Sequence, residues 1–416
     1  MIKNYKNISK CRLCNGVIKK IINFGNIALG NNLEKNINKA KKSKKYPLSI
    51  NRCIECNHFQ LSSSVNPKIL FATNYTYLSG IGTSFLKHFD TYSTWLIKKI
   101  HLNKNDLILD IGSNDGTCLS FFKKKGMKIL GIDPAKLASD IANKNGLNTI
   151  NQFFDLKSKK FIEKKYGKPK VITSHNVLAH IDDIQNTFKL AYDLLQDNGY
   201  LCFEVGYFKN VIQNKFFDTI YHEHLDYHHA NPLIKMLNKI GFSVKMIATN
   251  KIQGGTIRIL SKKSKLIINN KQVNIFCTSE KKSILYKEKS IINAFKNFFK
   301  NGKKIQRFFI KNKDKKIIGY GAPTKAVLLN KIINVNNNYI DFTLEDNLLK
   351  SGKYLPTSGV KIVKFDHNLL KDVDYLFIYA WNFSKDIIQK IRKAKNIFRS
   401  NLFVIIPLPE LKIIKI

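Results

Sequence analysis

A strand, a glycine-rich turn, a helix, a second strand and an acid follow one another between residues 107 and 133. The apolar run LILDI leads into the turn GSNDG, whose glycines let the backbone approach a ligand closely. Asp133 ends the second strand, where an acid accepts hydrogen bonds from two ribose hydroxyls. The pattern predicts an α/β domain with a doubly wound sheet. Its ligand-binding turn is expected to contain Asp110, Gly112, Asn114 and Gly116.

This turn lacks the GxGxxG pattern of dinucleotide-binding domains. It resembles the DxGxxxG turn of class I S-adenosylmethionine methyltransferases, so we expect S-adenosylmethionine as the cofactor. Ligands of such sheets lie at the carboxyl ends of the strands. Asn176 follows one further strand, and Phe153 or Phe154 follows another and is expected to flank the adenine ring. Core packing is an equally good account of the two phenylalanines, and an unliganded βαβ unit is the alternative for the whole motif.

Two CxxC pairs, CRLC and CIEC, stand near the N-terminus. One such turn brings two thiolates to a tetrahedral ion, and a second turn completes a four-thiolate site. Without a recognisable signal peptide, metal binding is favoured over disulfides, and free or redox thiols are the alternative. The sequence therefore predicts one structural zinc per chain. Its ligands are expected to be Cys11, Cys14, Cys53 and Cys56.

The chain has 416 residues, which is too long for one core, and 44% of them are hydrophobic, as in globular proteins. No apolar run is long enough to span a bilayer, so we expect a cytoplasmic protein without a membrane partner. The net charge of +42 raises the possibility of nucleic-acid binding. However, the excess is mostly lysine spread along the chain, together with abundant asparagine and isoleucine, which are residues of AT-rich codons. No specific nucleic acid is therefore expected, although the field favours anionic small substrates.

The stretch YHEHLDYHH (221–229) concentrates histidines and allows a metal site, a catalytic base or a polar surface loop. In an extended segment, Tyr221 and Glu223 would share one face, with His222 and His224 on the other. Ligands two apart on a straight strand lie about 7 Å apart and point in parallel, which disfavours a metal. The last two histidines, His228 and His229, are expected to be exposed and to have no role.

Several fragments, in order, together resemble the sugar C-methyltransferases, which methylate C3 of a nucleotide-bound 4-keto-deoxyhexose. They are the two CxxC pairs, NYTYLSG (74–80), LDIGSNDG, GIDPA, HNVLAHI, FDTIYHEHLDY, QGGTIRI and GYGAPTKA. The resemblance covers nearly the whole chain and implies three domains. We expect a zinc-binding domain (1–72), an S-adenosylmethionine-binding domain (73–258) and a C-terminal Rossmann-like domain (259–416).

Carbon methylation requires that the weakly acidic C3–H beside the ketone be removed and the enolate stabilised. Histidine is the natural base near neutral pH. The resemblance points to His224 as this base, with Tyr221 and Glu223 as its polar partners. It also implies that His180 approaches from a neighbouring strand end and that Tyr75 lies near the methyl donor and substrate. Tyr77 is the weaker alternative to Tyr75.

The sequence KKIIGYGAPTKAVLLNKI predicts a second strand–turn–helix unit, preceded by a long amphipathic helix. Its turn, with Gly321, and the helix N-terminus can present N–H groups to a phosphate near Lys325. The resemblance implies that Gly321, Lys325, Tyr77 and His222 bind a nucleotide-diphosphate sugar substrate. For the turn with Gly321 and Lys325, a structural role is nearly as well supported. The competing functions are sugar O-methylation, a nucleic-acid-binding methyltransferase and a non-catalytic binding protein.

Overall fold

The computed structural model of the chain describes residues 4–72, 78–81, 83–393 and 401–416. This part divides into two compact units. Unit 1 combines residues 1–20, 50–209 and 223–286, and unit 2 combines residues 21–49, 210–222 and 287–416. The division falls inside the histidine-rich stretch, between His222 and Glu223. Among the described residues, no helix is both long enough and apolar enough to cross a membrane.

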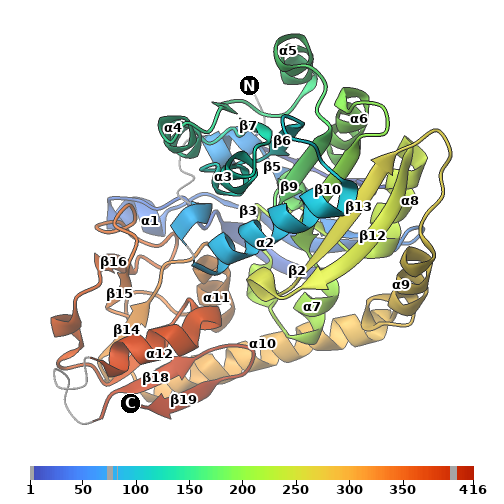
Figure 1. Cartoon of the computed structure of the whole chain (residues 1–416). Coiled ribbons are helices and arrows are strands. Elements are labelled where there is room, and N and C mark those ends of the chain that lie inside the picture. The colour runs from blue at the N-terminus through green and yellow to red at the C-terminus, as the bar shows by residue number, and fades with distance from the viewer. Residues whose placement is uncertain (1–3, 73–77, 82, 394–400) are drawn as a thin grey trace. The chain divides into compact units, whose positions relative to one another are not determined.

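Within the described residues, a seven-stranded sheet forms the centre of unit 1 (Figure 1). Strands β6 to β10 run parallel, and β13 is antiparallel to both of its neighbours. The parallel strands are short apolar runs, which suits a sheet with helices on both faces. This sheet confirms the predicted doubly wound domain. In spatial order its strands are β12 (Phe242–Asn250), β13 (Thr256–Lys263), β10 (Tyr200–Gly206), β9 (Val171–His175), β6 (Leu107–Ile111), β7 (Lys128–Ile132) and β8 (Thr149–Ile150).

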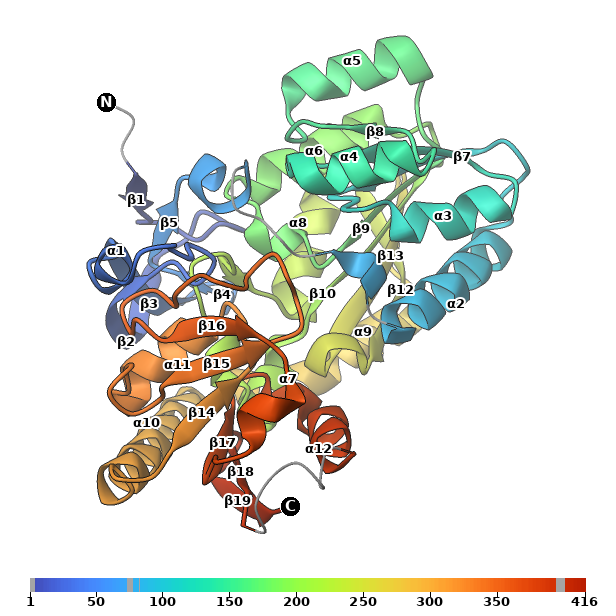
Figure 2. The same cartoon turned by 90° about the vertical axis from the view of Figure 1, so that its left-hand side faces the viewer.

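Helices connect these strands and cover both faces, with α3 and α4 on one face and α6 and α8 on the other (Figures 1 and 2). Helix α2 buries Phe89, Tyr92 and Leu96, which recur at helical spacing and join the core beneath α3. The helices of unit 1 are α2 (Thr83–Ile100), α3 (Thr117–Lys124), α4 (Lys136–Lys144), α5 (Leu156–Tyr166), α6 (Ile184–Leu194), α8 (Ala230–Ile240) and α9 (Lys271–Lys281).

The cysteine pairs of unit 1 lie at turns between small antiparallel strands, and Cys53 ends one of these strands. β1 (Tyr5–Asn7) pairs with β5 (Ser63–Val65). β4 (Phe59–Leu61) pairs on one side with the end of β3 (Lys45–Cys53) and on the other with the two-residue β11 (Asp226–Tyr227). The strand that carries Cys53 is thus two strands away from the end of the histidine-rich stretch. Three elements continue from one unit into the other: β3, β2 (Ile18–Ala28) and α7 (Phe208–Gln213).

Unit 2 has a six-stranded sheet in which all strands but the last are parallel, with α11 and α12 on opposite faces (Figure 2). The predicted long helix is confirmed as α10 (Glu288–Lys311), which buries Ile291, Phe295 and Phe298. The remaining helices are α1 (Ile37–Lys41), α11 (Ala326–Ile333) and α12 (Ser384–Arg392). In spatial order the strands are β16 (Lys361–Lys364), β15 (Phe342–Glu345), β14 (Ile317–Tyr320), β17 (Tyr375–Ile378), β18 (Phe403–Ile406) and β19 (Lys412–Lys415).

Candidate active site and zinc centre

The turn between β6 and α3 has the backbone that its glycines predict. Gly112 and Gly116 have φ angles of +72° and +75°, which favour glycine. A Cβ atom on Gly112 would lie 2.3 Å from the side chain of Val177, and one on Gly116 would lie 2.7 Å from Leu147. Both glycines are therefore required for the turn to pack against its neighbours. The turn leaves a backbone-lined cradle at the carboxyl end of the sheet.

Asp133 follows β7 and lies beside this turn. Its carboxylate accepts hydrogen bonds from the backbone N–H groups of Asn114 (2.9 Å) and Ala135 (2.8 Å). Burial raises the pKa of Asp133, and these two hydrogen bonds oppose the increase. Asp110, at the end of β6, is 2% exposed, and its Oδ1 has no hydrogen-bond partner among the described residues. Burial, then the charge of Asp133, holds the pKa of Asp110 well above its ordinary value.

The other residues predicted to bind S-adenosylmethionine lie at or after the ends of neighbouring strands. Asn176 directly follows β9, adopts a φ of 55° and donates its N–H to the carbonyl of Glu204 at 2.8 Å. Phe153 is half-buried in the loop after β8. An unpartnered carboxyl oxygen, a glycine cradle and an acid at the next strand end fit an adenosyl ligand. The individual contacts of these residues with such a ligand stay predictions.

The end of the NYTYLSG segment lies against the glycine turn. Ser79 donates its N–H to Oδ1 of Asn114 at 2.9 Å, and Gly80 donates to Oδ2 of Asp115 at 2.8 Å. The predicted residues Tyr75 and Tyr77 precede this contact and lie outside the described residues. The sequence predicts Asn114 only as a residue that binds S-adenosylmethionine. Its second role, holding the NYTYLSG segment through Ser79, is not indicated by any local pattern.

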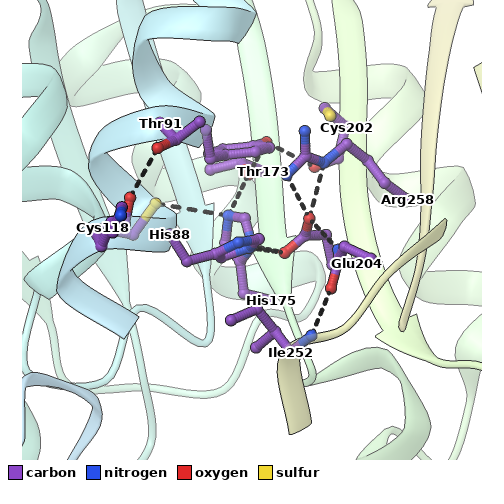
Figure 3. Close-up of polar contacts among 12 residues, drawn as sticks. His88, Thr91, Cys118, Thr173, His175, Cys202, Glu204, Ile252 and Arg258 are labelled. Carbon is purple, nitrogen blue, oxygen red and sulfur yellow. Dashed lines mark hydrogen bonds and ion pairs between the residues drawn. The ribbon is translucent and has the colours of Figure 1, made fainter. Parts of the chain in front are cut away.

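A buried ionic cluster centred on Glu204 lies at the carboxyl ends of β9 and β10 (Figure 3). Its Oε2 accepts hydrogen bonds from His88 Nε2 (2.7 Å) and His175 Nδ1 (3.2 Å), and Arg258 Nη2 lies 2.6 Å from Oε1. Burial alone would raise the pKa of Glu204, but the hydrogen bonds from His175 and His88 and the charge of Arg258 hold it well below its ordinary value. A glutamate inside the apolar strand YLCFEVG was the only sequence signal of this cluster.

We expect Glu204→Gln to lower the free energy of unfolding by about 3–5 kcal/mol at neutral pH, because Arg258 then loses its buried counter-charge. Since the folded-state pKa of Glu204 is depressed, its stabilisation is present above the ordinary value of 4.5 and is lost as the pH falls through the folded-state pKa. In denaturant unfolding, the difference in free energy of unfolding between wild type and Glu204→Gln should thus be smaller at pH 3 than at pH 7. Asp90→Asn is the control, because it removes only an exposed pair with Lys125. If Glu204→Gln and Asp90→Asn lowered the free energy of unfolding by the same small amount, this expectation would be contradicted.

The YHEH motif forms a turn, so the arrangement of faces considered for an extended segment does not occur. Residues 221–223 bend between the 3₁₀ helix Phe217–Thr219 and β11, and none of them pairs with a strand in the described part of the chain. Without a ladder partner, the alternation of faces does not apply. Tyr221 and His224 are half-buried, whereas Glu223 is 5% exposed.

Within unit 1, His180 and His224 face each other. Their ring centroids are 5.0 Å apart at an interplanar angle of 62°. The backbone bond from Leu225 N–H to the Ala179 carbonyl, at 2.7 Å, holds the two segments together. Burial lowers the pKa of His180 to about 4, although hydrogen bonds to the backbone of Glu223 and Asn176 oppose this. His180 is therefore a neutral imidazole at pH 7, and it does meet the YHEH motif as expected.

The other histidines of the stretch are buried. His222 is 3% exposed and its Nε2 lies 3.2 Å from the carbonyl of Tyr46, and burial lowers its pKa to about 4. His228 and His229 are both 0% exposed, so the expectation that they are exposed is wrong. His229 binds Oε2 of Glu280 at 3.0 Å, and His228 stacks on His58 with ring centroids 5.5 Å apart. These distant partners are invisible in the local sequence.

In unit 2, the predicted substrate residues follow β14. Gly321 has a φ of +88° and lines a pocket of about 440 Å³. Lys325 lies just before α11, but its ammonium is paired: Nζ is 3.1 Å from Oδ2 of the buried Asp218 and 3.0 Å from Oδ1 of Asn382. The indole N–H of Trp381 donates to the same Asp218 carboxylate. The positive charge of Lys325 is thus largely compensated, and the sequence reading missed Asp218.

The four predicted cysteines converge at one point in unit 1. All four Sγ atoms lie within 4.8 Å of one another, with Cys11 and Cys56 at 3.6 Å and Cys14 and Cys53 at 3.5 Å. A tetrahedral zinc with Zn–S bonds of about 2.3 Å requires S–S distances of about 3.8 Å, so the quartet fits zinc. Burial raises the pKa of Cys14 to about 12, so a cation is needed to keep thiolates there.

Three family models match consecutive parts of the chain. They are described as "Putative zinc binding domain" (residues 11–71), "Methyltransferase domain" (90–245) and "C-methyltransferase C-terminal domain" (251–409). Among characterised proteins, C-methyltransferase NovU of Streptomyces niveus is 26% identical over 411 residues, which are 98% of this chain and 97% of that protein.

Two solved structures resemble part of the chain. Magnesium protoporphyrin IX methyltransferase from Synechocystis, with bound S-adenosylmethionine, is 14% identical and covers 43% of this chain and 79% of its own, with a TM-score of 0.34. The CurJ carbon methyltransferase is 14% identical and covers 44% of this chain and 56% of its own, with a TM-score of 0.36. At these TM-scores, neither structure bears on the activity.

The domain models agree with the geometry of unit 1, where a donor turn and a four-cysteine site occur together. They follow one another along a chain that matches C-methyltransferase NovU over nearly the full length of both proteins. The chain therefore combines a zinc-binding domain, a methyltransferase domain and a C-methyltransferase C-terminal domain: it is an S-adenosylmethionine-dependent methyltransferase with a zinc site formed by Cys11, Cys14, Cys53 and Cys56.

Proposed function

We propose that this enzyme methylates C3 of a nucleotide-linked 4-keto-deoxy sugar through an enolate formed by a histidine base. The observation that carries the proposal is the close pair of half-buried imidazoles, His180 and His224, in the unit that contains the donor turn. O-methylation of a hydroxyl needs only a base. Carbon methylation also needs a group that stabilises the enolate, and a second polar ring beside the base supports that chemistry.

The two imidazoles are suited to different roles. His224 is half-buried and so accessible to a substrate, and we assign it as the base that takes the C3 proton. His180 is neutral at working pH, because its pKa is about 4, and it orients His224 or donates a hydrogen bond toward the C4 oxygen. Glu223, buried beside them, and Tyr221 are assigned as polar partners, and Tyr75 keeps its predicted role. S-adenosylmethionine, when bound, supplies the methyl group.

The substrate is proposed to use the turn after β14. Gly321 lines a pocket of about 440 Å³, which supports binding of a nucleotide at this turn. The pocket is lined by two lysines, Lys350 and Lys390, and by three acids, Glu345, Asp346 and Asp386, so its charge alone does not select an anion. Lys325 is assigned an indirect role, since Asp218 already compensates its charge. Tyr77 and His222 remain predicted substrate residues, the domain boundaries remain those predicted from the sequence, and we place the reaction in the cytoplasm.

The test is incubation of the purified enzyme with S-adenosylmethionine and a panel of nucleotide-4-keto sugars in heavy water. The expected result is replacement of one hydrogen by methyl at C3, seen by mass spectrometry and NMR, and deuterium exchange at C3 without the methyl donor. Methyl found on oxygen would replace the proposal by sugar O-methylation. Methyl transferred to RNA or DNA, with salt-dependent retention, would replace it by the nucleic-acid function that the charge of +42 raises.

A further inference from the structure

A single buried arginine connects the zinc site with the proposed catalytic histidines. Arg12 stands between Cys11 and Cys14, and its side chain is 4% exposed. Its Nη1 donates to Oδ1 of Asp182 at 2.8 Å and to the carbonyl of the same residue at 2.9 Å. On the other side, its Nε lies 3.7 Å from Oδ1 of Asp226, which is fully buried. One guanidinium therefore lies between two carboxylates from distant parts of unit 1.

These two carboxylates stand at matching places beside the two imidazoles. Asp182 follows His180 by two residues, and Asp226 follows His224 by two residues. Two residues is too short a distance for the backbone to move independently of an anchored side chain. Holding Asp182 and Asp226 therefore restrains both segments whose rings lie 5.0 Å apart.

The second cysteine pair reaches the same carboxylate. His58 closes the turn that holds Cys53 and Cys56, with its carbonyl accepting the N–H of Cys53 at 2.8 Å. Its Nε2 lies 2.8 Å from Oδ1 of Asp226, and both side chains are fully buried. Both zinc-binding turns thus contact Asp226.

A further side chain fixes the first turn relative to the strand beside Asp226. Gln60 pairs with Asp226 across β4 and β11. Its Oε1 accepts the N–H of Arg12 at 2.8 Å, and its Nε2 donates to the carbonyl of Lys10 at 3.1 Å. The position of the Arg12 backbone is therefore set by the same strand that positions Asp226.

We propose that Arg12 is a positioning residue: the zinc-binding turns hold Arg12 and His58, and these hold Asp182 and Asp226 so that His180 and His224 keep their mutual geometry. This inference rests on the proposed function of the two histidines. A misplacement of about 1 Å at a reacting group costs about 100-fold in rate, so a remote anchor of this kind affects turnover. Lys6 also lies 2.5 Å from Asp182, but it is exposed at the surface and cannot replace the buried guanidinium of Arg12.

The test compares Arg12→Met and Arg12→Lys with Lys6→Met, a matched control that removes the exposed partner of the same Asp182. For Arg12→Met we expect unchanged zinc content, S-adenosylmethionine affinity within about 3-fold of wild type, and kcat and C3–H exchange lowered by about 10- to 100-fold. KM should change less than kcat. In Arg12→Lys, kcat and C3–H exchange should lie between those of wild type and Arg12→Met, because an ammonium reaches one carboxylate but not both. Lys6→Met should behave as wild type.

A substrate-free measurement separates this inference from the proposed function. Side-chain NMR should show shifted or broadened imidazole signals of His180 and His224 in Arg12→Met and not in Lys6→Met. Unchanged signals in a folded Arg12→Met would overturn the positioning role, whatever the substrate. If Arg12→Met loses zinc or fails to fold, Asp226→Asn replaces it. This variant keeps an acceptor for His58 and removes the charge that faces Arg12, and an unchanged His224 signal in it would equally overturn the inference.

Discussion

Replacing His224 by glutamine is expected to lower kcat by about 100- to 10,000-fold, because general base catalysis by a positioned side chain contributes a factor of that size. Glutamine preserves most of the volume of the half-buried ring but cannot take the C3 proton. S-adenosylmethionine binding, measured by calorimetry, should stay within about 3-fold of wild type, since the donor turn depends on its own glycines and on Asp133. Deuterium exchange at C3 should be lost together with methyl transfer.

The control for this variant is His101→Asn, which changes an exposed histidine in the turn after α2. Its φ of 54° lies in the left-handed region that asparagine tolerates. We expect its turnover to match that of the wild type. Near-full methyl transfer by His224→Gln would reject His224 as the base. In that case His180→Gln becomes the decisive variant, because its ring is the neighbouring imidazole.

Replacing Cys53 by serine is expected to abolish stoichiometric zinc binding and to unfold the segment around the cysteines. Structural zinc sites contribute about 10–16 kcal/mol in apparent binding free energy, which matches or exceeds the total stability of a typical domain of about 5–15 kcal/mol. Cys53 is fully buried, and its Sγ accepts the N–H of Cys56 at 3.4 Å, so its loss also removes a contact within the turn. Metal analysis and thermal unfolding measure both effects.

Cys277→Ser is the matched control, because Cys277 is a half-buried cysteine outside the quartet. It should keep one zinc per chain and an unfolding transition within about 1 kcal/mol of wild type. A Cys53→Ser protein with full zinc occupancy and wild-type stability would contradict the assignment of this cysteine. Equal zinc loss in both variants would show that the effect is not specific to the quartet.

Patterns with short spacing were enough to predict the donor turn and the zinc site. Gly112 and Gly116 adopt the positive φ angles that only glycine tolerates readily, and the four cysteines meet as the two CxxC turns require. The long amphipathic helix α10 also follows from its own residue spacing. In each case the physical constraint acts within a few residues, so the local sequence carries it.

The conformation and burial of the histidine-rich stretch could not be predicted from its local sequence. In an extended segment its side chains would alternate, but residues 221–223 bend and pair with no strand in the described part of the chain, and only Asp226 and Tyr227 join a sheet, as β11. His228 and His229 are buried because His58 and Glu280, which are distant in the sequence, cover them. Pairing and burial depend on which segments meet, and neither is encoded in a nine-residue window.

The sequence by itself determined which residue types stand at the glycine turn, in the cysteine pairs and in the YHEH motif, because these depend on backbone conformation and ligand chemistry nearby. Only the tertiary structure decided that Glu204 gathers two histidines and an arginine, that Asp218 compensates Lys325, and that Arg12 faces both Asp182 and Asp226. The physical reason is that charges buried in a low dielectric require partners, and those partners come from segments that only folding brings together.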